Sequence, residues 1–273
     1  MLRMESEAGW WLITHPDHAH LAGDFAAAWG NAQFRKPEPR SRVLKGIACH
    51  DDGWAARDAH PSITRQGKPS AFSTELVGKY SAFEEIDLEE YLAVRDRAVR
   101  IMAEEDPYAG LLISMHTYNL LTAHADRSTI APEGVALLDS FLARQKHYQE
   151  ELRTKIARDA SLTEVEKTEQ TILEHFRLLQ ACDNLSLLTC VAFSSPSHLL
   201  HPLPLKDGGT NEVKAFPIGP RHFHLAPWPF EDRELTFAFP ARHVAGKLFP
   251  DSQSLDAAFN AAPIDKLTVM LSA

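Results

Sequence analysis

Apolar residues recur every three to four positions through roughly the first 190 residues, which is the spacing of amphipathic helices. After residue 193 the chain is rich in proline and glycine, and short runs alternate between apolar and polar residues as strands do. Asp17 is expected to cap the first helix, and Thr163–Glu166 resembles a capping box before the last one. The pattern predicts helices at about 18–29, 41–50, 87–104, 107–121, 132–157 and 167–188, and extended segments at 10–14, 235–239 and 267–271.

These elements predict a mainly α fold with two parts. A helical domain is expected over residues 1–192, and a small β-rich C-terminal extension over residues 193–273 is expected to pack on it. The stretch 58–73 is rich in proline, glycine and serine, which predicts a surface loop. The glutamates at positions 84, 85, 89 and 90 are expected to form a solvated acidic face.

Composition limits the classes of partner and the compartment. The chain has 273 residues, of which 44% are hydrophobic and 24% charged, as in an ordinary soluble globular protein. A net charge of −9 makes nucleic acid an unfavourable partner. The sequence contains no membrane-length apolar stretch and no recognisable signal peptide, and its cysteines form no CxxC pair. We therefore expect a cytoplasmic protein whose cysteines, Cys49, Cys182 and Cys190, are reduced and pack in the core.

The doublet His50-Asp51 is the strongest chemical signal in the chain. It ends the apolar run 43–49 and is followed by Asp52, Gly53 and Trp54. Two ionisable side chains at the end of an apolar helix are costly to bury unless a partner such as a divalent metal ion compensates them. The doublet therefore predicts a metal site where this helix ends.

Three further candidate ligands lie in similar settings on other predicted helices. His18 begins the first helix, and His116 follows the apolar run 111–115. Asp183 lies in the middle of an apolar helix, where an unpaired carboxylate would be expensive. Because each residue comes from a different helix, we expect the helices to bring them together with the doublet at one site.

The order His, His-Asp, His, Asp resembles the HD-domain superfamily of metal-dependent phosphohydrolases. This resemblance covers about residues 10–190 and implies an all-helical bundle with His18, His50, Asp51 and Asp183 as metal ligands. More narrowly, the chain resembles an uncharacterised bacterial branch with a His-Asp-Asp-Gly-Trp motif, here 50–54, and a Trp-Pro-Phe motif, here 228–230.

Two details of the resemblance stay open in the sequence. His15 and His20 flank His18 and are alternatives for the first ligand. Catalytic members of the superfamily often carry a lysine shortly after the doublet, where this chain has Trp54. Other basic residues could take over the phosphate contact, but their spacing selects none of them: Lys45, Arg57, Arg65 and Lys68.

The types of ligand limit which metal ions the site would bind and which chemistry they would support. A mixed set of imidazole and carboxylate ligands favours Zn, Mn, Fe, Co or Ni over Mg or Ca. Water bound to such an ion is more acidic and can act as a nucleophile. Asp51 could accept a proton from this water, whereas His116 could bind or protonate a phosphate or hold a second ion. The site is therefore expected to hold one or two divalent transition-metal ions.

Three functions compete at this point. The first is a metal-dependent hydrolase of a small phosphorylated substrate, such as a nucleotide. The second is a di-iron oxygenase of similar architecture, in which His116 is a ligand together with His124 or His147. The third is a non-catalytic binding protein that retains a structural metal, which the absent lysine and the added β extension favour. A homodimer is an open alternative for the assembly.

Two other motifs favour structural roles. His222 and His224 alternate as on one face of a strand, and a solvated strand face is favoured over a second metal site. The aromatic motif Trp228-Pro229-Phe230 is expected to pack the β extension against the helices.

Overall fold

The computed structural model describes residues 1–79 and 87–273. The expected acidic positions Glu84 and Glu85 therefore lie outside the described residues. The helices are α1 (His15–Ala28), α2 (Arg40–Ala48), α3 (Ala55–Asp58), α4 (Leu88–Glu105), α5 (Pro107–Ala123), α6 (Pro132–Ala157), α7 (Glu169–Cys190) and α8 (Ser252–Ala261). The strands are β1 (Leu2–Glu5), β2 (Gly9–Ile13), β3 (Ser197–His198), β4 (Leu203–Pro204), β5 (Thr210–Asn211), β6 (Lys214–Gly219), β7 (His222–Ala226), β8 (Glu234–Ala245) and β9 (Ile264–Ser272).

Seven of these strands form one mixed sheet in the order β1-β2-β8-β9-β7-β6-β3. The pair β7–β9 is parallel, and the other neighbouring pairs are antiparallel. Gly9 of β2 lies opposite Ala245 of β8, so strands from both ends of the chain are neighbours. Strands β4 and β5 form a separate two-stranded sheet.

The prediction of a mainly α, all-helical fold with a small C-terminal β extension is wrong. The protein has an α/β fold, because a seven-stranded sheet that begins with residue 2 accompanies the helices. Strands β1 and β2 are only four and five residues long, and β2 pairs with residues more than 200 positions away. Local periodicity carries no information about such a pairing.

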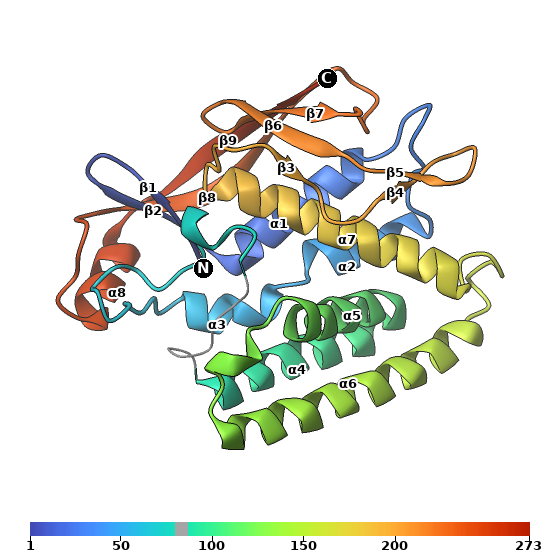
Figure 1. The fold of residues 1–273 in the computed structure, drawn as a ribbon, viewed down its shortest axis with the longest axis horizontal. Helices are drawn as coiled ribbons and strands as arrows, with labels where there is room; N and C mark the ends of the chain where they lie inside the picture. Colours follow the sequence, from blue (N-terminus) through green and yellow to red (C-terminus); the bar gives the residue numbers. More distant parts are fainter. Residues whose placement is uncertain (80–86) are drawn as a thin grey trace.

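One large hydrophobic cluster contains residues of both the helices and the sheet. The ring of Phe25 on α1 packs edge-on against Phe237 of β8, with ring centroids 4.9 Å apart. Trp29, just after α1, packs against Phe230 with centroids 5.5 Å apart, which confirms that the Trp-Pro-Phe motif joins the β part to the helices. Figure 1 shows α1 and α7 between the sheet and the layer formed by α4, α5 and α6. The five candidate ligands are thus enclosed on the helical side of the molecule.

The helix boundaries correct two of the expected caps. Thr14, not Asp17, caps α1: its side chain accepts a hydrogen bond from the backbone N–H of Asp17. Thr163 and Glu166 do exchange hydrogen bonds, but they close a turn before α7, which Thr168 caps.

Two further observations concern membrane spans and cysteines in the described residues. None of the described helices combines the length and apolar character needed to cross a membrane. The three cysteines are free thiols, and burial raises the pKa of each.

Candidate metal centre

Four helices bring the predicted ligands together. His18 lies in the first turn of α1, the His50-Asp51 doublet follows α2, His116 lies on α5, and Asp183 lies on α7. All five side chains are buried. The structure therefore joins every residue of the predicted ligand set in one place.

A close approach of α1 and α2 positions the first two histidines. A Cβ atom at Gly23 would lie only 2.6 Å from the Cβ atom of Ala48, so a larger residue at position 23 would separate the two helices. With glycine there, the rings of His18 and His50 have centroids 5.3 Å apart. The glycine is thus a local requirement for the site.

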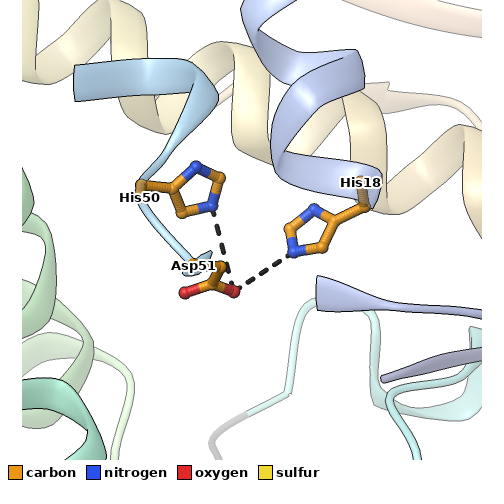
Figure 2. Close-up of side chains that lie close together, drawn as sticks. All are labelled: His18, His50 and Asp51. Carbon is orange, nitrogen blue, oxygen red and sulfur yellow. Dashed lines mark hydrogen bonds and ion pairs between the residues drawn. The ribbon is translucent and has the colours of Figure 1, made fainter. Parts of the chain in front are cut away.

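Two pairs of donor atoms have the spacing expected around a bound ion. The Nε2 atom of His18 lies 3.2 Å from Oδ2 of Asp51, and Nε2 of His50 lies 4.0 Å from the same oxygen (Figure 2). Nε2 of His50 is also 3.3 Å from Oδ1 of Asp183, whose Oδ2 is 3.9 Å from Nε2 of His116. Ligands at about 2.1 Å from one ion lie about 3.0 to 3.4 Å from their neighbours. The pairs at 3.2 and 3.3 Å match this spacing, and the pairs at 3.9 and 4.0 Å are longer than it.

These atoms form two overlapping groups of potential ligands. One group comprises His18, His50 and Asp51, and the other comprises His50, His116 and Asp183. Within each group the ligand atoms lie within 4.8 Å of one another. His50 belongs to both groups, so the five residues form a single cluster.

Hydrogen bonds hold His18 and His50 in the orientation of metal ligands. Nδ1 of His50 donates to the carbonyl oxygen of Ile47 at 2.7 Å. Nδ1 of His18 donates to the hydroxyl oxygen of Ser186 at 3.0 Å, and this hydroxyl donates to the backbone oxygen of Asp183. Because Nδ1 is used in both rings, Nε2 faces the carboxylates, and Nε2 of His50 has no hydrogen-bond partner among the described residues. In metal-bound histidines the ring nitrogen that does not bind the metal typically donates to a protein oxygen in this way.

The electrostatics of the cluster favour a cation. Burial disfavours the charged form of His50, but the carboxylates of Asp51 and Asp183 outweigh it and raise the pKa of His50 to about 9. Burial opposes ionisation of the two aspartates as well, yet neighbouring positive groups lower the pKa of both. Burial lowers the pKa of His116 to about 3. The two carboxylates thus stay ionised in a buried setting where positive charge is favourable.

Arg95 is a member of the cluster that the sequence analysis missed. Its Nη1 atom donates to Oδ1 of Asp51 at 2.5 Å, and its side chain is buried. The guanidinium lies over the rings of Trp54 and Tyr91, 5.0 and 5.5 Å from their centroids. Trp54 stands where a lysine was expected. Its ring packs against the guanidinium of Arg95, which comes from α4.

A signal for Arg95 was present in the sequence. Leu88, Leu92, Arg95 and Val99 follow one another at intervals of three or four residues, so the arginine lies on the apolar stripe of its helix. Gly53 lets α4 approach, since a Cβ atom there would lie 2.6 Å from that of Ala98.

The neighbours of His18 do not share its position. His15 contacts Asp58 instead, with 2.9 Å between Nδ1 and Oδ2. The side chain of His20 is 59% exposed and lies near Asp52. Of the three candidates for the first ligand, the cluster therefore contains His18.

Other candidate residues lie elsewhere. His147 is exposed on α6 beside glutamates of the same helix, and His124 ends α5.

The basic residues considered for a phosphate contact have other partners or places. Lys45 pairs with Glu105, and the guanidinium of Arg57 lies over Trp54 at 5.5 Å from the ring centroid. Arg65 and Lys68 belong to the loop that a backbone bridge closes between residues 63 and 69. In β7, His222 contacts Ser272 and the ring of His224 lies near that of Phe216.

Comparison with known proteins places the chain in a family. No curated protein and no solved structure matches it. A family model described as "Protein of unknown function (DUF3891)" matches residues 1–246. This span contains all five cluster residues, Arg95 and the sheet strands up to β8. The chain therefore belongs to the DUF3891 family.

Proposed function

We propose that the protein is a metal-dependent hydrolase that acts on a small phosphorylated molecule, such as a nucleotide. His18, His50, Asp51 and Asp183 would hold one divalent transition metal. The observation that carries the proposal is that two buried Nε2 atoms face two buried carboxylates at 3.2 and 3.3 Å. The order of these residues along the chain, which resembles the HD-domain pattern, supports the same interpretation.

The ligand set suits Zn, Mn, Fe, Co or Ni, since it mixes two imidazoles with two carboxylates. When bound, such an ion makes a coordinated water more acidic, so that hydroxide is available near neutral pH. Oδ2 of Asp51 faces His18 and His50, and Arg95 holds the other oxygen. Asp51 is therefore kept ionised and oriented, both as a ligand and as an acceptor for a proton from water.

Arg95 supplies the positive charge that the missing lysine would have provided. Its Nε atom is buried and has no hydrogen-bond partner among the described residues. A guanidinium has five N–H donors in a planar fork and matches phosphate or carboxylate oxygens well. An anionic substrate beside Asp51 would meet this cation, which supports the proposed phosphorylated substrate.

A di-iron oxygenase is the second candidate. The group formed by His50, His116 and Asp183 favours it, because it offers donors beyond those that one ion needs. Binding of two iron ions with oxygen consumption would support this function, whereas one ion per chain would exclude it.

The test compares metal content and phosphate release in matched variants. Asp51→Asn and Asp183→Asn are each expected to weaken metal binding by about tenfold or more and to abolish hydrolysis of a nucleotide panel. Asp52→Asn is the control, because this neighbouring carboxylate is 45% exposed and should be dispensable. Unchanged metal content and hydrolysis in the first two variants would refute the proposal. Metal binding by the wild type without hydrolysis of any nucleotide would instead support a non-catalytic metal-containing protein.

A further inference from the structure

His116 differs from the other two histidines in what contacts its Nδ1 atom. Nε2 of Gln180, on α7, lies 3.4 Å from Nδ1 of His116. The same amide nitrogen donates to Oδ1 of Asn119 at 3.0 Å. On its other side, Oε1 of Gln180 lies 2.7 Å from Nε2 of His201. The glutamine is fully buried, so its amide is held among these three side chains.

The direction of these hydrogen bonds determines where His116 carries its proton. An amide nitrogen can only donate, so Nδ1 of His116 must accept and cannot itself carry a hydrogen. The proton of His116 is then on Nε2, the atom that faces Oδ2 of Asp183 at 3.9 Å. His18 and His50 have the opposite arrangement, because their Nδ1 atoms donate to Ser186 and Ile47. The three imidazoles of the cluster thus differ at Nδ1, which accepts a hydrogen bond in His116 and donates one in His18 and His50.

We propose that Gln180 holds His116 in the Nε2–H tautomer, so that His116 points a hydrogen-bond donor into the cluster and is not a metal ligand. A nitrogen that carries a proton has no free electron pair to offer a metal ion. The centre then holds one ion, and His116 recognises an oxyanion, which in a phosphoryl substrate is a phosphate oxygen. The metal in this proposal rests on the proposed function, whereas the tautomer of His116 does not.

His201 anchors the glutamine from outside the helical layer. It lies between β3 and β4, and its backbone has a left-handed φ of 66°. This conformation is uncommon for residues other than glycine, although histidine adopts it more often than most. His201 donates to Oε1 and so keeps the amide oxygen away from His116. The segment after α7 therefore contributes to a site whose other members are on helices.

Nuclear magnetic resonance of the full chain, with ¹⁵N-labelled histidine, tests the proposal. The ring nitrogen shifts distinguish the two tautomers in the metal-free protein, and the His116→Asn variant identifies the signals of His116. We expect a hydrogen on Nε2 but none on Nδ1 for His116, and a hydrogen on Nδ1 for His18 and His50. On addition of Zn²⁺, the Nε2 signals of His18 and His50 should shift while His116 keeps its tautomer, and metal analysis should find one ion per chain.

Two variants test whether Gln180 is the positioning residue. A carboxylate at this position accepts a hydrogen bond, so Gln180→Glu should reverse His116 to the Nδ1–H tautomer. His201→Phe retains a ring beside Phe176 but removes the donor to Oε1, so His116 should show both tautomers. Gln253→Glu, on the exposed first turn of α8, makes the same charge change elsewhere and should leave His116 unaltered.

Zinc affinity provides an independent measurement. His116→Asn should change it by less than about threefold, whereas His50→Asn should reduce it by about tenfold or more. The Nδ1–H tautomer for His116 in the wild type, or a zinc-dependent shift of its Nε2 signal, would overturn the proposal. If zinc moved none of the three histidines, the metal site of the proposed function would fail, while the tautomer in the metal-free protein would still decide the role of Gln180.

Discussion

Arg95 and His50 show how single residues set the charge of the cluster. Arg95 neutralises one oxygen of Asp51, and Asp51 with Asp183 makes the protonated form of His50 favourable despite its burial. A buried charge whose partner is removed destabilises the fold more strongly than the intact pair stabilises it. Both residues therefore lead to measurable predictions at the scale of one side chain.

Arg95→Met should destabilise the metal-free protein by about 3 to 5 kcal/mol, because it leaves the carboxylate of Asp51 buried without this partner. Combining it with Asp51→Asn should recover much of this loss, which urea denaturation of the four proteins in the cycle would measure. Arg100→Met is the control on the same helix: its ion pair with Asp96 is exposed and should contribute less than about 0.5 kcal/mol. Additive effects in the cycle would contradict the pairing.

The pKa of His50 predicts a pH dependence of stability in the metal-free protein. Since the pKa is about 9 in the folded state and 6.5 for an unperturbed histidine, protonated His50 stabilises the fold. This contribution is complete below pH 6.5 and is lost as the pH rises through 9, and it amounts to about 3 kcal/mol. The free-energy difference between wild type and His50→Asn should therefore shrink between pH 6.5 and 9. A difference that does not vary with pH would contradict the assignment.

At the scale of elements, the turn after α2 determines whether the cluster forms. The doublet, Gly53 and Trp54 lie in this turn, and the close approach of α4 to Gly53 brings Arg95 to Asp51. Helix positions were largely readable from the sequence, because periodicity and capping are local properties. The distance between two helices depends on small residues at their contact, which periodicity does not report.

Gly53→Ala should push α4 away and destabilise the protein by about 1 to 3 kcal/mol, because the new Cβ atom would lie 2.6 Å from that of Ala98. Adding Ala98→Gly should relieve the overlap, so the double variant should be less destabilised than the sum of the single variants. Thermal denaturation and zinc affinity measure the two effects. Gly219→Ala is the control, because its Cβ atom would meet nothing closer than 3.5 Å. Equal losses at both glycines would argue against a specific contact.

At the scale of the whole molecule, the sheet joins the two ends of the chain. Strand β2 pairs with β8 along one of its edges, and the ring of Phe25 on α1 packs against the ring of Phe237 on β8. His201 comes from the same later segment and contacts Gln180 beside the cluster. Residues beyond position 192 therefore pack against the helices that hold the candidate ligands and contact residues beside the cluster.

A fragment of residues 1–192 should accordingly fail to unfold cooperatively and should bind zinc weakly or not at all. In the full chain, circular dichroism and tryptophan fluorescence should report one transition, because Trp10 of β2 and Trp54 beside the cluster belong to the same folded unit. A fragment that unfolds cooperatively and binds zinc as the full chain does would show that the helical part folds alone.

The sequence by itself indicated the positions of the main helices and the cluster residues other than the first histidine. Both follow from local properties, namely apolar periodicity and the cost of burying His50, Asp51 and Asp183 without a partner. The tertiary structure alone decided that His18 rather than His15 or His20 joins them, and that Arg95 contacts Asp51. It also decided that the fold is α/β, since β2 finds its partner more than 200 residues away. These features depend on packing between distant segments, and local periodicity does not show which segments pack together.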